Sequence, residues 1–321
     1  MSLQKATLDK DLAKISRLET ATKILSSGLV AHTSALLFLI TAGFIGAFFT
    51  GVEDEKAIIV FAAILGGYMA LNIGANDVAN NVGPAVGSKA MSIFAALLMA
   101  AVFESAGALL AGGDVVSTIS KGIIDPELVP NNKMFINAMM AALMAAAVWV
   151  NLATVLGAPV STTHAVVGGV MGAGIAAVGF QLVNWNMMAA IAASWVISPV
   201  LGGIIAALFL AFIKVNLIYK EDKILAANRW IPVLVAIMAT AFACYLSVKG
   251  LKRIWKPDFE IVLFIGLVTF IIVWSIMTPI IKRQSQGMEN RNRSLRVLFK
   301  IPLICSAALL SFAHGANDVA N

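Results

Sequence analysis

The chain has 321 residues, of which 60% are hydrophobic and 12% are charged, and its net charge is +6. Soluble domains are usually about 45–50% apolar and about 25% charged, so this composition and a mean hydropathy of +0.90 exclude an ordinary soluble domain. Only helices and closed barrels satisfy every backbone group in lipid, and the apolar runs here do not alternate as barrel strands do. We therefore predict an all-α polytopic membrane protein, whose Lys and Arg side chains set its topology and do not indicate nucleic-acid binding.

Residues 1–31 combine basic and acidic side chains with apolar residues at near-helical spacing, namely Leu8, Leu12, Ile15, Leu18 and Leu25. This pattern predicts an amphipathic helix on the cytoplasmic membrane surface. A solvated helix without lipid contact fits the pattern equally well.

Long apolar segments follow along the rest of the chain. We predict membrane spans at 33–51, 57–88, 90–112, 134–157, 163–180, 187–213, 231–249 and 261–281, with a last span that begins at 301. The strongly basic loop 282–300 is cytoplasmic by the positive-inside rule. Counting back from it places the basic N-terminus in the cytoplasm and the acidic turn Glu53-Asp54-Glu55 outside.

One heptapeptide, Gly-Ala-Asn-Asp-Val-Ala-Asn, occurs at 74–80 and again at 315–321. Both copies lie in apolar segments, where a carboxylate costs about 2.5–3.5 kcal/mol at the helix centre, so each Asp is expected to be functional. On the predicted span count the two copies cross the membrane in opposite directions. This arrangement is typical of inverted-topology repeats, which in secondary transporters enclose a site near the membrane midplane.

Two segments contain helix-breaking residues and are predicted to be interrupted helices. Residues 57–88 hold several glycines and Pro84, so we expect this helix to unwind around the motif. Residues 157–164, Gly-Ala-Pro-Val-Ser-Thr-Thr-His, should break a helix and cap the next one through Ser161 and Thr162. Interrupted apolar segments of this kind indicate a transporter binding site.

Polar side chains near these breaks suggest what is bound. On a helix, Asn72, Asn76 and Asn80 would form one stripe with Asp77 beside it. Their oxygens suit a hard cation, while amide N–H groups suit an anion. No Lys or Arg lies deep in a span, so an anion would be held by helix N-termini, hydroxyls, amides and a co-bound cation. Ser161, Thr162 and Thr163 offer three hydroxyls and three backbone N–H groups for that purpose.

The two motif carboxylates bear on which anion is bound. An ionised Asp only accepts hydrogen bonds, and hydrogen phosphate still carries a P–OH donor that sulfate lacks. Asp77 and Asp318 would therefore favour phosphate over sulfate. Ligation of a driving cation by the same carboxylates is the alternative, and one carboxylate can do both.

Four motifs together resemble the inorganic phosphate transporter (PiT) family. They are Gly-Ala-Asn-Asp-Val-Ala-Asn-Asn at 74–81, Ile-Ser-Lys-Gly-Ile at 119–123, Pro-Val-Ser-Thr-Thr-His at 159–164 and the second heptapeptide at 315–321. The resemblance implies symport of inorganic phosphate across the cytoplasmic (inner) membrane, driven by sodium or protons, in some bacterial members with a metal–phosphate complex. It also implies a functional glutamate after the first motif, a place that Glu104 occupies.

The resemblance further implies a division of the chain. We expect an amphipathic segment at 1–31, an additional N-terminal transmembrane helix at 32–56, a first transport repeat at 57–213, connecting helices and basic loops at 214–300, and the start of a second repeat at 301–321. The sequence stops inside the second signature, so this chain is expected to be a fragment with half of the site.

The site we predict has overlapping substrate and cation parts. Phosphate is assigned to Asp77, Ser161, Thr162, Thr163, Asp318 and Asn76, and the coupling cation or proton to Asn76, Asp77, Asn80, Asn317, Asp318 and Glu104. No cofactor, dedicated metal centre, enzymatic activity or nucleic-acid partner is expected; lipid is, and a homodimer is allowed. A sulfate permease and a non-transporting scaffold are the alternatives. His164 and His314 adjoin the motifs, and a structural hydrogen bond is favoured over proton coupling for both.

Overall fold

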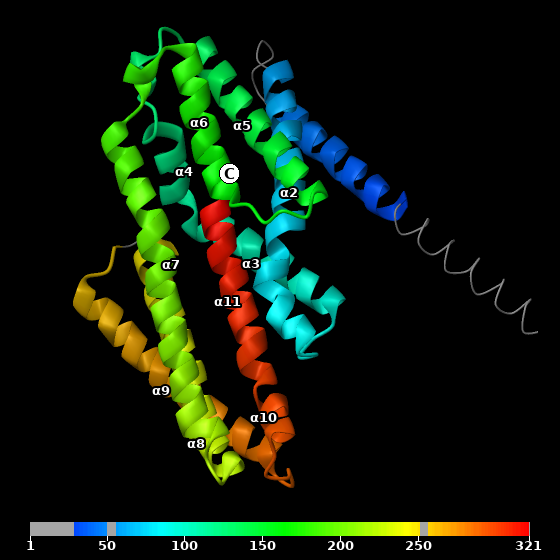
Figure 1. Cartoon of the computed structure of the whole chain (residues 1–321), viewed down its shortest axis with the longest axis vertical. Coiled ribbons are helices and arrows are strands. Elements are labelled where there is room, and N and C mark those ends of the chain that lie inside the picture. The colour runs from blue at the N-terminus through cyan, green and yellow to red at the C-terminus, as the bar shows by residue number, and fades with distance from the viewer. Residues whose placement is uncertain (1–28, 50–55, 251–255, 321) are drawn as a thin grey trace, which may run out of the picture. The chain divides into compact units, whose positions relative to one another are not determined.

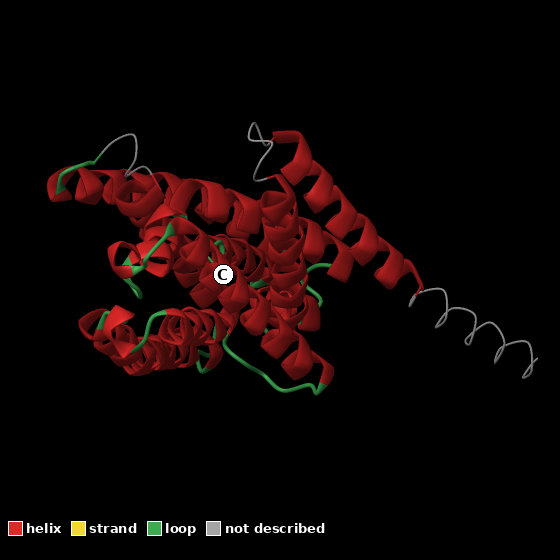
Figure 2. Cartoon of the chain, turned by 90° about the horizontal axis from the view of Figure 1, so that it is seen from above, coloured by secondary structure: helices red, strands yellow, loops and turns green. Residues whose placement is uncertain are grey.

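The computed structural model describes residues 29–49, 56–250 and 256–320. The amphipathic helix predicted within 1–31 falls almost wholly outside these residues, and the acidic turn at 53–55 and the motif's last residue, Asn321, lie outside them too. Within the described residues every regular element is a helix or a helical turn (Figure 2), and no strand forms. The prediction of an all-α polytopic membrane protein is confirmed.

The chain divides into two compact units, one up to Asn72 and one from Ile73 onward. In the first, helix Leu29–Phe49 packs on the beginning of α2 (Lys56–Gly87). Small residues set this contact, because a Cβ at Gly46 would lie 3.0 Å from the Cβ of Ala63. This first helix has 21 residues and is apolar and long enough to span a membrane.

The second unit begins within α2 and contains the remaining helices (Figure 1). Their bounds are α3 Ile93–Ala111, α4 Gly113–Lys121, α5 Asn132–Val155, α6 Thr162–Ala177, α7 Trp185–Ile213, α8 Lys223–Tyr245, α9 Phe259–Ser285, α10 Asn292–Leu298 and α11 Lys300–Asp318. Short 3-10 turns η2 (Pro126–Leu128) and η3 (Phe180–Leu182) and π-helical turns η4 (Lys214–Ile218) and η5 (Leu246–Gly250) join or extend them.

Seven described helices are long and apolar enough to cross a membrane, and the pair α10–α11, bent by 44°, forms an eighth candidate. The predicted span 163–180 is different, because α6 has only 16 residues. At 1.5 Å per residue such a helix is about 24 Å long, shorter than the roughly 30 Å hydrocarbon core. The prediction of a full span there is therefore wrong.

Helices α5 and α6 pack against each other as a hairpin. Close approach is possible because Gly169 faces the backbone of α5, where an added Cβ would lie 2.8 Å from the oxygen of Ala142. The two helices of the hairpin are unequal in length, because α5 has 24 residues and is one of the seven candidate spans, whereas α6 has 16 residues and is not.

Helix α2 differs from the sequence-based prediction, because it runs unbroken through the first motif for 32 residues. Gly74 and Gly83 lower helix propensity by about 1 kcal/mol each, but in lipid a broken backbone leaves polar groups unsatisfied at several times that cost. Pro84 lies in the last turn, so the hydrogen bond that it cannot make affects only the end of the helix. The other predicted break is confirmed at residues 156–161, between α5 and α6.

The two motif segments run in opposite directions. In Figure 1 residues 73–87 of α2, in cyan, run downward, whereas α11, in orange to red, runs upward. The loop between α5 and α6 passes the C-terminal end of α11 in the same view. The beginning of α6 and the end of α11, which are far apart in sequence, therefore lie side by side, as the hydrogen bond between Thr163 and Asp318 also shows.

Candidate functional site

Helices α3 and α11 pack backbone to backbone in the second unit. Gly315 lies against Glu104, and a Cβ at Gly315 would lie 2.1 Å from the backbone oxygen of Glu104. Gly107 faces α11 in the same way, 2.0 Å from the oxygen of Phe312. Because no side chain separates the two backbones, the side chain of Glu104 reaches the residues on α11 that precede the second motif.

His314 is the centre of the resulting cluster. Its Nδ1 lies 3.2 Å from Oε1 of Glu104, and its Nε2 lies 3.9 Å from Oδ2 of Asp77. The same Nε2 contacts Oδ2 of Asp318, one helical turn further along α11. One imidazole thus joins carboxylates from α2, α3 and α11.

The first turn of α6 completes the cluster from another side. Oγ1 of Thr162 donates a hydrogen bond to Oδ2 of Asp77 over 3.1 Å, and Oγ1 of Thr163 donates to Oδ1 of Asp318 over 3.4 Å. These contacts bridge 85 and 155 positions of sequence. The two copies of the motif are therefore held on adjacent threonines of one helix N-terminus.

Two asparagines of the first motif support the cluster from the side. The amide of Asn81 donates to Oε1 of Glu104 over 3.1 Å, and that of Asn76 donates to Oγ1 of Thr154 over 3.1 Å. The Asn81 bond fixes the carboxylate that faces His314. The Asn76 bond ties α2 to the end of α5, next to the α5–α6 loop.

The other predicted site residues do not join these contacts. Asn80 and Asn317 are exposed, and neither takes part in a contact that holds the described cluster together. Ser161 is the N-cap of α6, and its Oγ accepts from the backbone N–H of His164. The cap uses the amide of His164 and none of the amides of residues 161–163, so the expected role of those three amides in holding an anion stays a prediction.

The cluster is mostly shielded and carries excess negative charge. The side chains of His314 and Asp77 are each 15% exposed, that of Glu104 is 22% exposed and that of Asp318 is 12% exposed. Three ionised carboxylates around one imidazole leave two uncompensated negative charges even when the imidazole is protonated. In a poorly solvated site this charge demands cations or protons, since unpaired buried charges are strongly disfavoured.

The oxygens and nitrogen of Asp77, His314 and Asp318 lie within 4.8 Å of one another, close enough to hold one cation. His314 was not among the site residues predicted from the sequence, where a structural hydrogen bond was favoured for it. Its position four residues before Asp318 was the available signal, because that spacing puts both side chains on one helix face.

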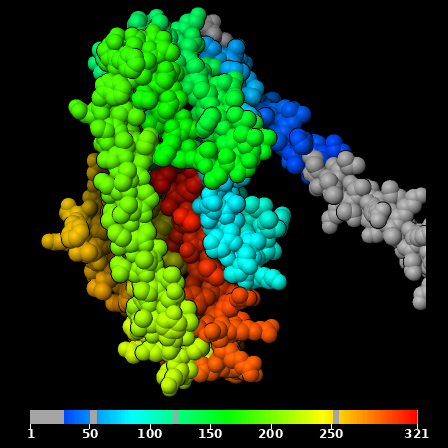
Figure 3. Space-filling view, in the orientation of Figure 1, coloured from blue at the N-terminus to red at the C-terminus, as the bar shows by residue number. Residues whose placement is uncertain are grey.

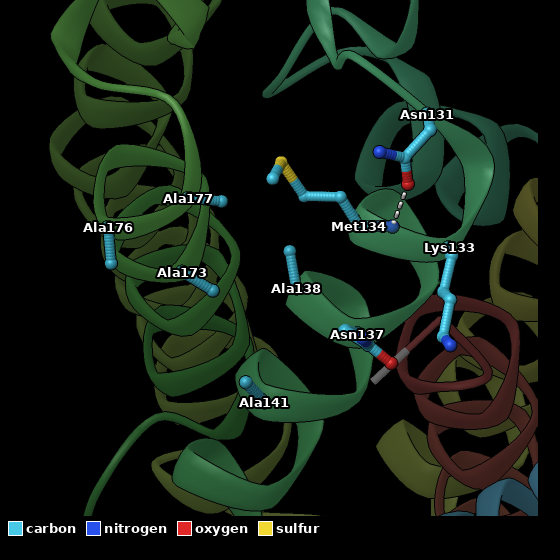
Figure 4. Close-up of a pocket in the computed structure, with 9 residues that line it drawn as sticks. All are labelled: Asn131, Lys133, Met134, Asn137, Ala138, Ala141, Ala173, Ala176 and Ala177. Atoms are coloured by element: carbon cyan, nitrogen blue, oxygen red, sulfur yellow. Dashed lines mark hydrogen bonds between the residues drawn. The ribbon is translucent and has the colours of Figure 1, made fainter.

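The His314 cluster lies apart from a cavity at the other end of the α5–α6 hairpin. Figure 3 shows the end of α11, in dark red, recessed between α7 and the α5–α6 segment. The other cavity, of about 480 Å³, lies where α5 and α6 diverge and is lined largely by alanines. In Figure 4 Met134 points toward α6, whereas Lys133 and Asn137 point away from it, so no charged group converges there.

Comparison with known proteins places the chain in a family. The sequence matches the phosphate transporter family over residues 73–321. The chain belongs to this family. Its members are transporters rather than enzymes, as the sequence predicted.

Individual relatives agree with that assignment. A protein of Helicobacter pylori described as "Putative phosphate permease" is 50% identical over 97% of this chain, and one of Chlamydia trachomatis with the same description is 37% identical over 82% of it. The matches cover 58% and 67% of those two proteins. A solved structure titled "The sodium-dependent phosphate transporter" shares 34% identity with a TM-score of 0.76, over 82% of this chain and 65% of that one. The chain thus spans little more than half the length of its Helicobacter relative.

Proposed function

We propose that the full-length protein is a secondary transporter that carries inorganic phosphate into the cell together with a cation, with sodium as the preferred ion. The observation that carries the proposal is the charge of the site. Three carboxylates that share one histidine would repel an entering anion unless cations neutralised them first. Membership of the phosphate transporter family supports phosphate, and the sodium-dependent structural relative supports sodium.

The hydrogen bonds of the site suggest an order of binding. In the described conformation the hydroxyls of Thr162 and Thr163 donate to Asp77 and Asp318 and are not available to phosphate. A cation bound to those carboxylates would neutralise their charge and release the two hydroxyls from their hydrogen bonds to them. Phosphate would then dock on the first turn of α6, where the helix dipole also favours an anion. The cation therefore binds first, which couples the two fluxes.

The retained carboxylates also favour phosphate over sulfate. A P–OH group can donate to Asp77 or Asp318, whereas sulfate offers these acceptors no proton and leaves them repelled. The opposed directions of α2 and α11 suit a mechanism in which two inverted halves rock around the site.

Uptake of radiolabelled phosphate into proteoliposomes that contain the full-length protein tests the proposal. We expect an inward sodium gradient to drive uptake that neither a potassium gradient nor a pH gradient replaces, and unlabelled sulfate not to compete. Asp77→Asn should abolish uptake without loss of folded protein. Asp258→Asn, at an exposed carboxylate before α9, should transport at the wild-type rate.

Two results would contradict the assignment. Full transport by folded Asp77→Asn protein would show that the cluster is not the site. Equal uptake with a proton gradient alone would replace sodium by protons as the coupling ion.

A further inference from the structure

Helix α7 stands apart from its neighbours in the second unit. None of its residues, all of which the structure describes, is buried. Between α7, α8 and α11 lies a groove of about 650 Å³ in which only Ser306 and Tyr245 carry a polar side-chain group. Figure 3 shows α7, in yellow-green, beside α11, in red, along this groove. Its walls include Phe209 and Ile213 of α7, Met238 and Ala241 of α8, and Leu303 and Leu310 of α11.

A polar cavity of about 500 Å³ lies at the α7–α8 connection, one turn of α8 from the groove. Ala226, Trp230 and Leu234 are four residues apart on α8 and share one face, and they pass from the polar cavity into the apolar groove. The polar cavity is lined by Tyr219, Lys220 and Arg229 among others, and the guanidinium of Arg229 lies 5.1 Å from the Trp230 ring centre. One face of α8 therefore runs from this cavity, whose lining carries two basic residues and the acidic Glu221 and Asp222, to the apolar groove; below, the cavity is called the mouth, and the groove and the mouth together are called the channel.

The mouth lies at the most basic end of the described structure. Packing of Leu217, Ile231 and Leu295 in one core cluster joins residues 214–230 to residues 282–300. The two segments carry Lys214, Lys220, Lys223, Arg229, Lys282, Arg283, Arg291, Arg293, Arg296 and Lys300 against Glu221, Asp222 and Glu289. Asp222 is occupied as the N-cap of α8, where it accepts from the N–H of Leu225. The local field therefore attracts anions.

We propose that this channel binds one anionic phospholipid, with an acyl chain between α7, α8 and α11 and the headgroup phosphate at Lys220 and Arg229. Basic side chains beside interfacial aromatic residues are the usual partners of anionic headgroups on the cytoplasmic side of a membrane.

Native mass spectrometry of the full-length protein, titrated with phosphatidylglycerol or with phosphatidylcholine of the same acyl chains, tests the proposal. We expect one phosphatidylglycerol to bind tightly and phosphatidylcholine to bind at least tenfold more weakly. Removing one basic residue near an anionic lipid should weaken binding about fivefold, so Lys220→Gln with Arg229→Gln should weaken it about thirtyfold. Arg293→Gln, which removes a charge at the same end but outside the channel, should change it less than twofold.

A second pair of variants tests the acyl-chain part. Ala241→Trp should fill the groove and prevent binding without lowering the melting temperature, whereas Ala211→Trp, on α7 outside the groove lining, should leave binding intact. Equal binding of both lipids, or binding that persists in Ala241→Trp protein, would overturn the proposal. So would an absence of bound lipid together with destabilisation by Ala241→Trp, because that pair of results means protein fills the groove.

Discussion

The contact between Gly315 and Glu104 offers the sharpest test of how the site is assembled. In Gly315→Ala protein the new Cβ would lie 2.1 Å from the Glu104 oxygen and 2.6 Å from its Cα, whereas ordinary contacts begin at 3.4 Å. Helices α3 and α11 must therefore separate locally by about 1.3 Å, the difference between 3.4 and 2.1 Å. Overpacking of this kind costs about 1–3 kcal/mol.

The separation should also damage function, since it pulls Glu104 away from His314. Their present distance of 3.2 Å would exceed 4 Å if α3 moves as a rigid helix. We expect a lower melting temperature for the full-length protein in detergent and loss of most sodium-driven phosphate uptake. Gly172→Ala in α6 is the matched control, because nothing lies within 4 Å of its added Cβ. That substitution should leave uptake intact and raise helix stability by up to about 1 kcal/mol.

Wild-type melting and uptake by Gly315→Ala protein would refute the reasoning. That result would mean that the transporter does not hold α3 and α11 at this distance. A lower melting temperature with full uptake would contradict only part of the reasoning. It would confirm that α3 and α11 touch at Gly315, but it would show that this contact does not position Glu104 for transport.

Three further predictions concern individual side chains. Thr162→Val should abolish phosphate-dependent thermal stabilisation in sodium, whereas Thr162→Ser, which keeps the hydroxyl, should retain it; equal stabilisation of both would exclude a hydroxyl contact. His314→Gln should raise the sodium concentration needed for half-maximal uptake, because the cation loses one of its three candidate ligands, and an unchanged sodium dependence would remove His314 from the cation site. Lys249→Met breaks the half-exposed, 3.0 Å ion pair with Asp114 and should lower stability by less than about 1 kcal/mol, measured by thermal unfolding; a larger loss would mean that the pair is not solvated.

The composition and the residue pattern were enough to predict the membrane helices, the pair of motif carboxylates and one helix break. Few charges and long non-alternating apolar runs are enough to predict membrane helices, because lipid admits no other open structure. The repeated motif identified Asp77 and Asp318 as a pair, since carboxylates are rare inside membranes. The break at 156–161 was also predictable, because glycine and proline act locally on the backbone.

The same local rules for glycine and proline gave a wrong prediction for the long helix α2. Gly74, Gly83 and Pro84 predicted unwinding in α2, yet the helix is continuous. Glycine weakens a helix without breaking it, and a proline near the C-terminal end interrupts few hydrogen bonds. The length of α6 was overestimated for a related reason, because an apolar run continues past Ala177 although the helix does not.

Only the tertiary structure decided which polar groups meet. His314 lies 210 residues from Glu104 and on a different helix, so no spacing rule relates them; the contact exists because Gly107 and Gly315 let α3 and α11 touch backbone to backbone. A separate contact, between the first turn of α6 and the end of α11, joins Thr163 to Asp318, whereas Asn317 is exposed. A motif names residues that are adjacent in sequence, but a helix turns neighbours to different sides, and packing against other helices decides which of them faces the site.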